Sequence, residues 1–177
     1  MGDAGAHFQA EFFQVCCYLS GGTYFTVGQL RVLVNVTAPA NHFGHNLLNL
    51  RQRHPYWHIA LGIHPWWAVK AEADALVELD ALLTTHSAQI TAVGEIGLDF
   101  VLDTESFSRQ ETLFSEQLSL AKQYHKPVIL HHRKSQPQLL AELKRQQFAE
   151  GGILHAFSGS QQQAKAFTDL GFKLGIG

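Results

Sequence analysis

Cysteine is almost absent from this sequence, and long apolar runs are missing altogether. Its two cysteines, Cys16 and Cys17, are adjacent within a chain of 177 residues. Such a pair forms neither a disulfide framework nor a spaced metal-binding motif, so we expect a protein of the reducing cytoplasm. No apolar stretch is long enough to cross a bilayer, and no basic segment leads into one near the N-terminus. The sequence therefore predicts neither a membrane span nor a signal peptide.

The sequence also lacks a strong excess of charge of either sign. Its formal net charge of −2 excludes the broad basic surface with which many proteins coat nucleic acid. A substrate with phosphates would therefore depend on local cations, either a few Arg or Lys side chains or a bound metal. With 46% hydrophobic residues the chain can form a real core, and its length suits one domain over residues 1–177. It is short for a closed eight-fold α/β barrel, which usually needs about 250 residues.

From about residue 30 onward, short apolar runs alternate with amphipathic segments, which predicts a parallel sheet covered by helices. The predicted strands are Leu30–Val36, His58–Ile63, Ile90–Glu95, Pro127–Leu130, Gly151–Leu154 and one that begins at Phe172. The predicted helices are Asn41–Arg53, Ala71–His86, Glu105–Tyr124, Ser135–Phe148 and one that opens with a Ser160–Gln163 capping box and stops at Gly171. Residues 12–30 contain no charged residue and fit neither pattern clearly.

Polar side chains close four of the predicted strands, namely His64, Glu95, His131 and His155. Because the carboxyl ends of parallel strands meet at one edge of a sheet, we expect these side chains to share one site. One unpaired charge in a core is costly, whereas four such groups can satisfy each other around a cation. In the alternative interpretation each is an ordinary hydrogen-bonded structural residue, and Glu95 pairs with Arg133.

The residue types at these strand ends suit a divalent metal. Two imidazoles and a carboxylate can bind Zn²⁺ or Mn²⁺ and leave room for water. A carboxylate that bridges two ions would let them activate water and hold a phosphoryl oxygen together. The other histidines lack this placement, since His58 opens its strand and His132 should alternate away from the site. We therefore predict one or two divalent ions, Zn, Mn or Mg, bound at Glu95.

In their order and spacing, the stretches "GIHPWW", "AVGEIGLDF", "PVILHHRKS" and "LHAFSGS" resemble the motifs of the TatD family of metal-dependent hydrolases. The resemblance runs from about Leu30 to Gly177, and its motifs are specific as a set. It implies a (β/α)8 TIM barrel of the metal-dependent hydrolase type, of which this chain holds roughly the first six to seven β/α units. It also implies a cytoplasmic phosphodiesterase, a deoxyribonuclease with 3′-exonuclease action.

The resemblance, and nothing else in the sequence, implies roles for single residues. Glu95 would be the carboxylate ligand and would bridge when two metals bind. His131 and His155 would be the ligands after the fifth and sixth strands of the barrel. His64 would line the pocket near the scissile phosphate, so that Glu95 and His64 are the predicted catalytic residues.

Three more positions match the family with roles outside the metal ligands. Arg133 and Ser158 lie in matching loops and, together with His64, would contact the substrate phosphate. Asp99 matches the family's "GLD" and, in the loop after its strand, would support the ligands without touching the metal.

The sequence departs from the family pattern at both ends. The family opens with Asp-x-His-x-His, and the aligned stretch "DAGAHF" has Gly5 where the first histidine belongs, which leaves His7 as a predicted metal ligand. The family's later metal-binding Asp, in a Glu-Thr-Asp-type motif, has no counterpart before Gly177. A barrel without its last strands would leave unpaired edges and an exposed apolar interior, so we expect this sequence to be a truncated form of a longer protein.

Three functions remain open. The first is a monomeric phosphodiesterase that acts on single-stranded nucleic acid or the 3′ ends of DNA and does not bind membranes. Trp66 and Trp67 would then either stack on a base or cap the core. The second is a catalytically impaired or inactive derivative, because Gly5 and the missing Asp remove part of the metal site. The third is cleavage of an amide or lactone, which Glu95 argues against, since the related amidohydrolases commonly place a lysine there.

Overall fold

The computed structural model describes residues 31–36, 48–49, 51–53, 55 and 57–175. The expectations for residues 12–30 and for His7 lie outside these residues. So does most of the predicted helix Asn41–Arg53, of which residues 48–49 and 51–53 are described and helical. In the part of the chain that is described, no helix is both long and apolar enough to cross a membrane.

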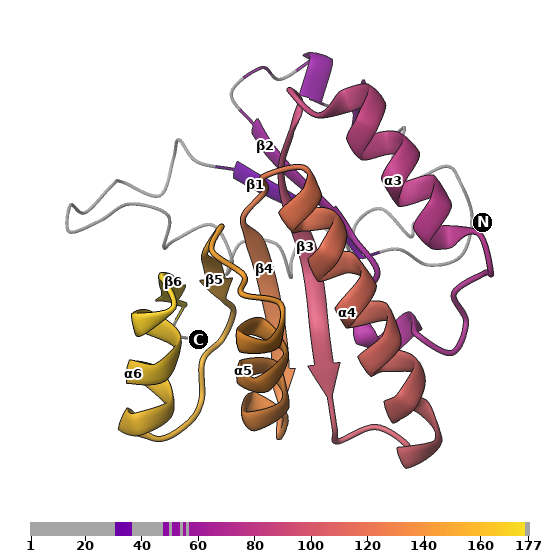
Figure 1. The fold of residues 1–177 in the computed structure, drawn as a ribbon. Coiled ribbons are helices and arrows are strands. Elements are labelled where there is room, and N and C mark those ends of the chain that lie inside the picture. Colours follow the sequence, from indigo (N-terminus) through magenta and orange to yellow (C-terminus); the bar gives the residue numbers. More distant parts are fainter. Residues whose placement is uncertain (1–30, 37–47, 50, 54, 56, 176–177) are drawn as a thin grey trace, which may run out of the picture.

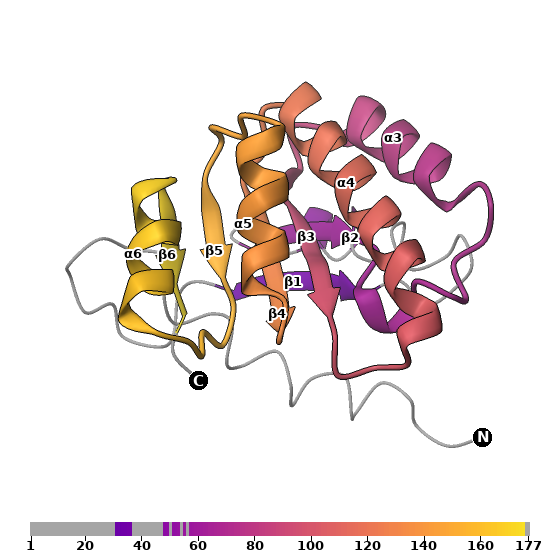
Figure 2. The ribbon, with the colours of Figure 1, turned by 60° about the horizontal axis from the view of Figure 1, so that its bottom comes forward.

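Six parallel strands form one sheet in chain order. They are β1 (Arg31–Val36), β2 (Trp57–Gly62), β3 (Ile90–Asp99), β4 (Val128–Arg133), β5 (Gly152–Leu154) and β6 (Phe172–Leu174). Parallel neighbours need crossover connections. The crossovers contain η2 (Pro65–Trp67), α3 (Ala75–His86), η3 (Thr104–Ser106), α4 (Phe107–Gln123), α5 (Gln136–Arg145) and α6 (Gln161–Asp169). Helices α3 to α6 lie on one side of the sheet (Figure 1, Figure 2). The predicted parallel α/β architecture is therefore confirmed.

The core lies between the sheet and these helices. Phe114 and Leu118 of α4 are 1% and 0% exposed, and they belong to the same buried cluster as Ile96 of β3 and Leu130 of β4. Burying one such side chain contributes about 1.5–3 kcal/mol relative to leaving it in water. Since α4 supplies these side chains, it is fixed firmly against the middle of the sheet.

Helix α6 begins as the sequence predicts. The Ser160 hydroxyl accepts a hydrogen bond from the Gln163 N–H at 3.2 Å, and the Gln163 side-chain oxygen accepts one from the Ser160 N–H at 2.9 Å. This capping box satisfies two N–H groups that a helix otherwise leaves free. At the other end of α6, the ring of Phe167 packs on Phe172 of β6 with centroids 6.1 Å apart.

Strand β3 contains a bulge at Glu95. In its register with β4, Gly94 pairs with Ile129 and Ile96 pairs with Leu130, so Glu95 is the extra residue. A bulge bends the strand and redirects the side chain that it carries. Glu95 therefore lies within β3 rather than at its end. As the extra residue of the bulge, it does not follow the regular alternation of side chains along the strand.

Strand β3 also continues further than predicted. Asp99 is the last residue of β3 and pairs with Arg133. The prediction that Asp99 lies in the loop after the strand was therefore wrong. The continuation depends on Gly97, whose φ is +140° and where an added Cβ would come within 2.1 Å of the His131 carbonyl oxygen. Only glycine permits this approach, and it lets β3 and β4 stay paired to the edge of the sheet.

Two buried glutamines of α4 fix the backbone at the ends of β2 and β3. Gln117 accepts a hydrogen bond from the Ile63 N–H at 2.5 Å and donates one to the Ile63 carbonyl at 3.1 Å. Gln110 accepts one from the Asp99 N–H at 2.8 Å and donates one to the Asp99 carbonyl at 3.2 Å. Both glutamines are 1% exposed. Being seven positions apart (117 − 110), they lie on one face of the helix, about two turns apart.

Candidate metal centre

The carboxylate of Glu95 lies at the centre of a group of histidines. Its Oε1 is 3.2 Å from His131 Nδ1, 3.3 Å from His155 Nδ1 and 3.9 Å from His64 Nε2. Burial alone would raise the pKa of Glu95, because only 7% of the residue is exposed. The hydrogen bonds with His131 and His155 outweigh burial and hold this pKa well below its usual range, so Glu95 is ionised at neutral pH.

His131 joins this carboxylate to a second one. Its Nδ1 faces Glu95 at 3.2 Å, and its Nε2 faces the Asp99 Oδ2 at 3.0 Å. His131 lies within β4, beyond the strand end predicted at Leu130, and the next residue, His132, turns the other way and packs on Phe157 with centroids 5.7 Å apart. His131 therefore has an acid on each edge, and His132 has none.

Asp99 is fully buried and accepts several hydrogen bonds. The Val101 N–H donates to its Oδ1 at 3.1 Å, and the Trp66 Nε1–H donates to its Oδ2 at 2.8 Å. Burial alone would raise the pKa of Asp99, but the hydrogen bonds from Trp66 and His131 lower it overall. Arg133 Nη1 lies 3.7 Å from the same Oδ2. The arginine thus contacts Asp99, and not Glu95 as the structural interpretation of the sequence supposed.

His64 and His155 approach Glu95 from the two sides. His64 follows β2 after Ile63, and its Nδ1 accepts a hydrogen bond from the Trp66 N–H at 3.2 Å. Burial lowers the pKa of His64 to about 4, although the negative charge of Glu95 acts to raise it. This ring is therefore neutral at pH 7. His155 follows β5, and its hydrogen bond with Glu95 raises its pKa.

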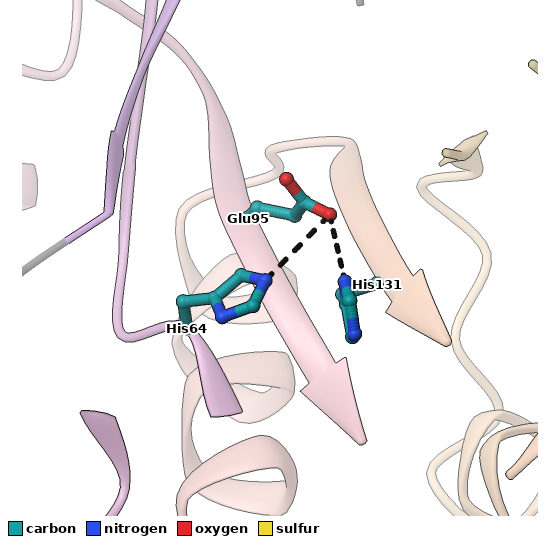
Figure 3. A group of neighbouring side chains, drawn as sticks. All are labelled: His64, Glu95 and His131. Carbon is teal, nitrogen blue, oxygen red and sulfur yellow. Dashed lines mark hydrogen bonds and ion pairs between the residues drawn. The ribbon is translucent and has the colours of Figure 1, made fainter. Parts of the chain in front are cut away.

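This donor set fits a divalent metal. The ligand atoms of His64, Glu95 and His131 all lie within 4.8 Å of one another, and Figure 3 shows the two rings turned toward the Glu95 carboxylate. The ligands of a tetrahedral zinc ion, each about 2.0–2.1 Å from it, are about 3.3 Å apart. The separations of Glu95 from His131 and His155, 3.2 and 3.3 Å, match this value better than the 3.9 Å to His64.

The remaining predicted site residues are exposed or lie outside the described residues. Ser158 is exposed, and its carbonyl accepts a hydrogen bond from Gln136 Nε2 at 2.7 Å. The side chain of Arg133 is 51% exposed at the rim. His7 lies outside the described residues. The structure therefore brings together His64, Glu95, His131 and His155, with Arg133 beside them.

Trp66 is a part of this site that the sequence left undecided. It is 52% exposed, while its indole N–H is bonded to buried Asp99. Its ring lies edge-on to that of His64, with centroids 4.9 Å apart. Trp67 is only partly buried, with Lys70 Nζ 5.3 Å from its ring centroid. Trp66 therefore lines the rim and does not cap the core.

Sequence reasoning missed the supporting glutamines Gln110 and Gln117. They interrupt the apolar face of α4, on which Phe114 and Leu118 are buried. A polar residue repeated at a seven-residue interval within such a face is a signal of a buried hydrogen bond, because an unpaired amide there would be costly.

Comparison with known proteins adds the family. Residues 7–177 match the family described as TatD related DNase. An Escherichia coli protein named "Uncharacterized metal-dependent hydrolase YjjV" is 44% identical over 131 residues, which are 74% of this chain and 51% of that protein. A protein of Edwardsiella piscicida named "3'-5' ssDNA/RNA exonuclease TatD" is 36% identical over 132 residues, 73% of this chain and 50% of that protein. The chain thus spans about half the length of these relatives.

Solved structures agree. The crystal structure of Escherichia coli YjjV, a TatD homolog, has a TM-score of 0.70 at 41% sequence identity and covers 77% of this chain and 53% of that one. A TatD family hydrolase from Entamoeba histolytica has a TM-score of 0.66 at 22% identity, covering 84% and 51%, and shares the fold. These likenesses confirm the resemblance and the TIM-barrel type predicted from the sequence. The chain belongs to the TatD family of metal-dependent hydrolases.

Proposed function

We propose that this chain is part of a divalent-metal-dependent hydrolase that cleaves phosphodiester bonds, a deoxyribonuclease that acts on nucleic acid ends. The observation that carries the proposal is the ionised carboxylate of Glu95, one oxygen of which faces three imidazoles at the ends of parallel strands. The name of the Edwardsiella piscicida relative, a 3'-5' ssDNA/RNA exonuclease, supports a nucleic acid substrate.

Glu95, His131 and His155 would hold the metal, which is Zn, Mn or Mg, and His7 would add a ligand in the family's manner. A divalent ion there supplies activation of water and stabilisation of the charge that develops on the phosphoryl oxygens. The low pKa of Glu95 means that this carboxylate is available as a ligand without first losing a proton.

Side chains at the rim would orient the nucleic acid. Arg133 keeps donors free for a phosphate, because its half-exposed guanidinium meets Asp99 only at 3.7 Å. Trp66 offers an exposed indole, held by Asp99, on which a base can stack. His64 is neutral at pH 7 and would donate a hydrogen bond to a phosphate oxygen, and the exposed Ser158 would add a further contact.

The test is an end-labelled single-stranded DNA incubated with the chain and Mn²⁺. We expect a 3′ label to be released as mononucleotide while a 5′-labelled strand shortens stepwise. Glu95→Gln should abolish both, and Glu116→Gln, on an exposed position of α4, should not. A folded chain that binds metal but leaves the strands intact would contradict the nuclease proposal. A folded chain that binds no metal would indicate the inactive derivative instead.

The other expectations belong to the same proposal. We infer a monomer in the cytoplasm and a single domain over residues 1–177. Light scattering after size exclusion measures the mass of the particle, and a mass about twice that of the chain would contradict the monomer.

A further inference from the structure

We propose that Trp66, Val101 and Leu102 form an apolar subsite that binds one nucleobase beside the cleaved bond through contact area alone. The base is then held without any reading of its hydrogen-bonding edge, and purines bind more tightly than pyrimidines. The inference rests on the nuclease function proposed above. It adds how the end of the strand is recognised.

Exposed apolar side chains gather in two loops next to the metal centre. Five large apolar side chains are exposed in the described part of the chain, and four of them follow β2 or β3, namely Trp66, Val69, Val101 and Leu102. The fifth, Val77, belongs to α3. A single exposed apolar residue is ordinary, but a group of them marks a binding surface. The rim therefore offers such a surface where a substrate would reach the centre.

The carboxylate of Asp99 holds these two loops together beside the centre. Its Oδ2 accepts a hydrogen bond from the Trp66 indole N–H at 2.8 Å, and its Oδ1 accepts one from the backbone N–H of Val101 at 3.1 Å. The same Oδ2 lies 3.0 Å from Nε2 of His131, and the ring centroids of His131 and Trp66 are 6.1 Å apart. One buried carboxylate thus places the indole and Val101 close to each other and to the metal centre.

The loop after β3 is fixed on both sides of its exposed residues. Before them, the ring of Phe100 packs on that of Phe107 with centroids 4.3 Å apart. After them, the Asp103 carboxylate accepts a hydrogen bond from the Glu105 N–H at 3.3 Å. Residues 101–102 lie between these two contacts and are exposed. Because the loop is already ordered, a ligand that binds there loses little free energy to ordering it.

None of the three side chains has a hydrogen-bonding group to spare for a base. Val101 and Leu102 are hydrocarbon, and the single donor of Trp66, its indole N–H, is bonded to Asp99. Every base has an aromatic face, whereas its donor and acceptor edge differs from base to base, so recognition by stacking tolerates any sequence. Purines should bind more tightly than pyrimidines because they cover more apolar surface.

The small size of this surface and the cation beside it favour a nucleotide over a protein partner. A stable protein–protein interface takes about 20–30 residues from each side, whereas one base stacks on a single aromatic ring. Arg133, whose side chain is 51% exposed, lies 3.7 Å from the Asp99 oxygen that also holds Trp66. The rim thus combines an apolar surface for a base with a guanidinium for the adjoining phosphate.

The experiment measures, by fluorescence anisotropy in Mn²⁺, how tightly the full 177-residue chain binds short labelled single strands of DNA. Phosphorothioate linkages at the 3′ end slow cleavage during the measurement. An abasic site at one of the two 3′-terminal nucleotides should weaken binding about 5- to 150-fold. Difluorotoluene, which has the shape of thymine but hydrogen-bonds poorly, should bind within about threefold of thymine at that position, and adenine about 2- to 5-fold more tightly.

Two variants test the apolar wall. Val101→Ser and Leu102→Ser should each weaken the binding of the intact strand about 3- to 10-fold, because apolar contact is lost. Neither should change the binding of the abasic strand, since the base that they contact is missing. Val77→Ser, at an exposed valine of α3, is the matched control and should stay within about twofold for both strands. A general loss of stability would instead weaken both strands alike.

Three results would overturn the subsite. Equal affinities for the intact and abasic strands would mean that the rim serves another apolar partner, such as a peptide or a lipid. Difluorotoluene that binds as weakly as the abasic site would mean that the edge of the base is read. Equal effects of Val101→Ser and Val77→Ser would remove the wall. Each of these leaves the nuclease proposal intact if the unmodified strand is cleaved. If the folded, metal-loaded chain neither binds nor cleaves that strand, the nuclease proposal is wrong, and this inference fails with it.

Discussion

Polar side chains are buried in two regions at the ends of β2 to β4, and they satisfy their charges and hydrogen bonds differently. On the side facing α4, Gln110 bonds to the backbone of Asp99 and Gln117 to that of Ile63. Each glutamine accepts a hydrogen bond from the N–H of its partner residue and donates one to the carbonyl of that residue. In the metal centre, one oxygen of Glu95 is shared by three imidazoles. The first region is complete without a ligand, and the second is completed by a proton or a cation.

This difference separates residues that stabilise the fold from residues that bind. A glutamine paired with a backbone amide contributes to the free energy of unfolding, because its loss leaves a buried N–H and carbonyl unpaired. The ionised carboxylate of Glu95 also stabilises the fold at neutral pH, because its pKa is lowered in the folded chain, but it offers in addition an oxygen that a cation can bind. Substitutions in the metal centre should therefore change zinc affinity, and substitutions of the two glutamines should change stability alone.

The largest effect is expected for Glu95→Gln. The amide has the size of the carboxylate but no charge, so Zn²⁺ affinity should fall by about 100-fold or more. The free energy of unfolding without metal should also fall, by up to about 3–5 kcal/mol at neutral pH, because the histidines lose their buried counter-charge; urea denaturation measures it. A large loss of stability with zinc binding intact would reverse the comparison.

Gln117→Leu should show the opposite pattern. It leaves the Ile63 N–H and carbonyl without the partners described here, at a cost of about 2–4 kcal/mol. Gln123→Leu, at an exposed position of the same helix, is the control and should stay within about 0.5 kcal/mol. Urea denaturation measures both. If Gln117→Leu loses zinc at unchanged stability, the two regions are not separable.

Trp66→Ala tests the rim of the centre. Stacking on an aromatic ring contributes about 1–3 kcal/mol per base, so the affinity for single-stranded DNA should fall about 5- to 150-fold. KM should rise while kcat changes little. Trp67→Ala, which removes the ring beside Lys70, should have a smaller effect on binding, as fluorescence anisotropy would measure. Equal losses in both variants would argue against a specific role of Trp66.

His132→Phe should have the smallest effect at neutral pH. This imidazole is 4% exposed, and neither ring nitrogen makes a hydrogen bond of ordinary geometry in the described part of the chain, although the Ala156 backbone lies close enough to oppose the lowering of its pKa. An apolar ring of similar shape should therefore change the free energy of unfolding by no more than about 1 kcal/mol. Zinc affinity should not change, in contrast to His131→Ala.

The same variant also tests how the stability of the chain depends on pH. Burial lowers the pKa of His132 from 6.5 to about 4, so the unfolded chain binds a proton at this residue before the folded chain does. Stability is then present above pH 6.5 and is lost as the pH falls from 6.5 to 4. The loss should be shallower in His132→Phe, measured as urea midpoints across this range. An identical pH profile in the two proteins would contradict the buried neutral state.

The order of strands and helices could be predicted because each element has its own apolar pattern. The extent of β3 could not. It depends on Gly97, where the approach of the His131 carbonyl lets pairing reach Asp99, and the sequence does not show which neighbour a glycine will meet. The bulge at Glu95 is likewise a property of the register with β4.

The convergence of His64, Glu95, His131 and His155 could be predicted, since they lie in the last residues of parallel strands or just after them, and such strands end at one edge of the sheet. Their hydrogen bonds could not, because the contacts of His131 with Asp99 and of His64 with the Trp66 backbone depend on tertiary geometry. The family resemblance proposed Asp99 as support for the ligands. The structure adds that its partners are His131 and Trp66.

Because Gln110 and Gln117 lie on one rigid helix, α4 fixes the distance between the two backbone segments that they bind. Seven residues at 1.5 Å each set about 10.5 Å between the two glutamines, and through them the relative positions of Ile63 and Asp99. Inserting or deleting one residue between them would turn one glutamine about 100° away from the sheet. Length changes in evolution or engineering should therefore be tolerated in the loops around this helix, but not within its middle two turns.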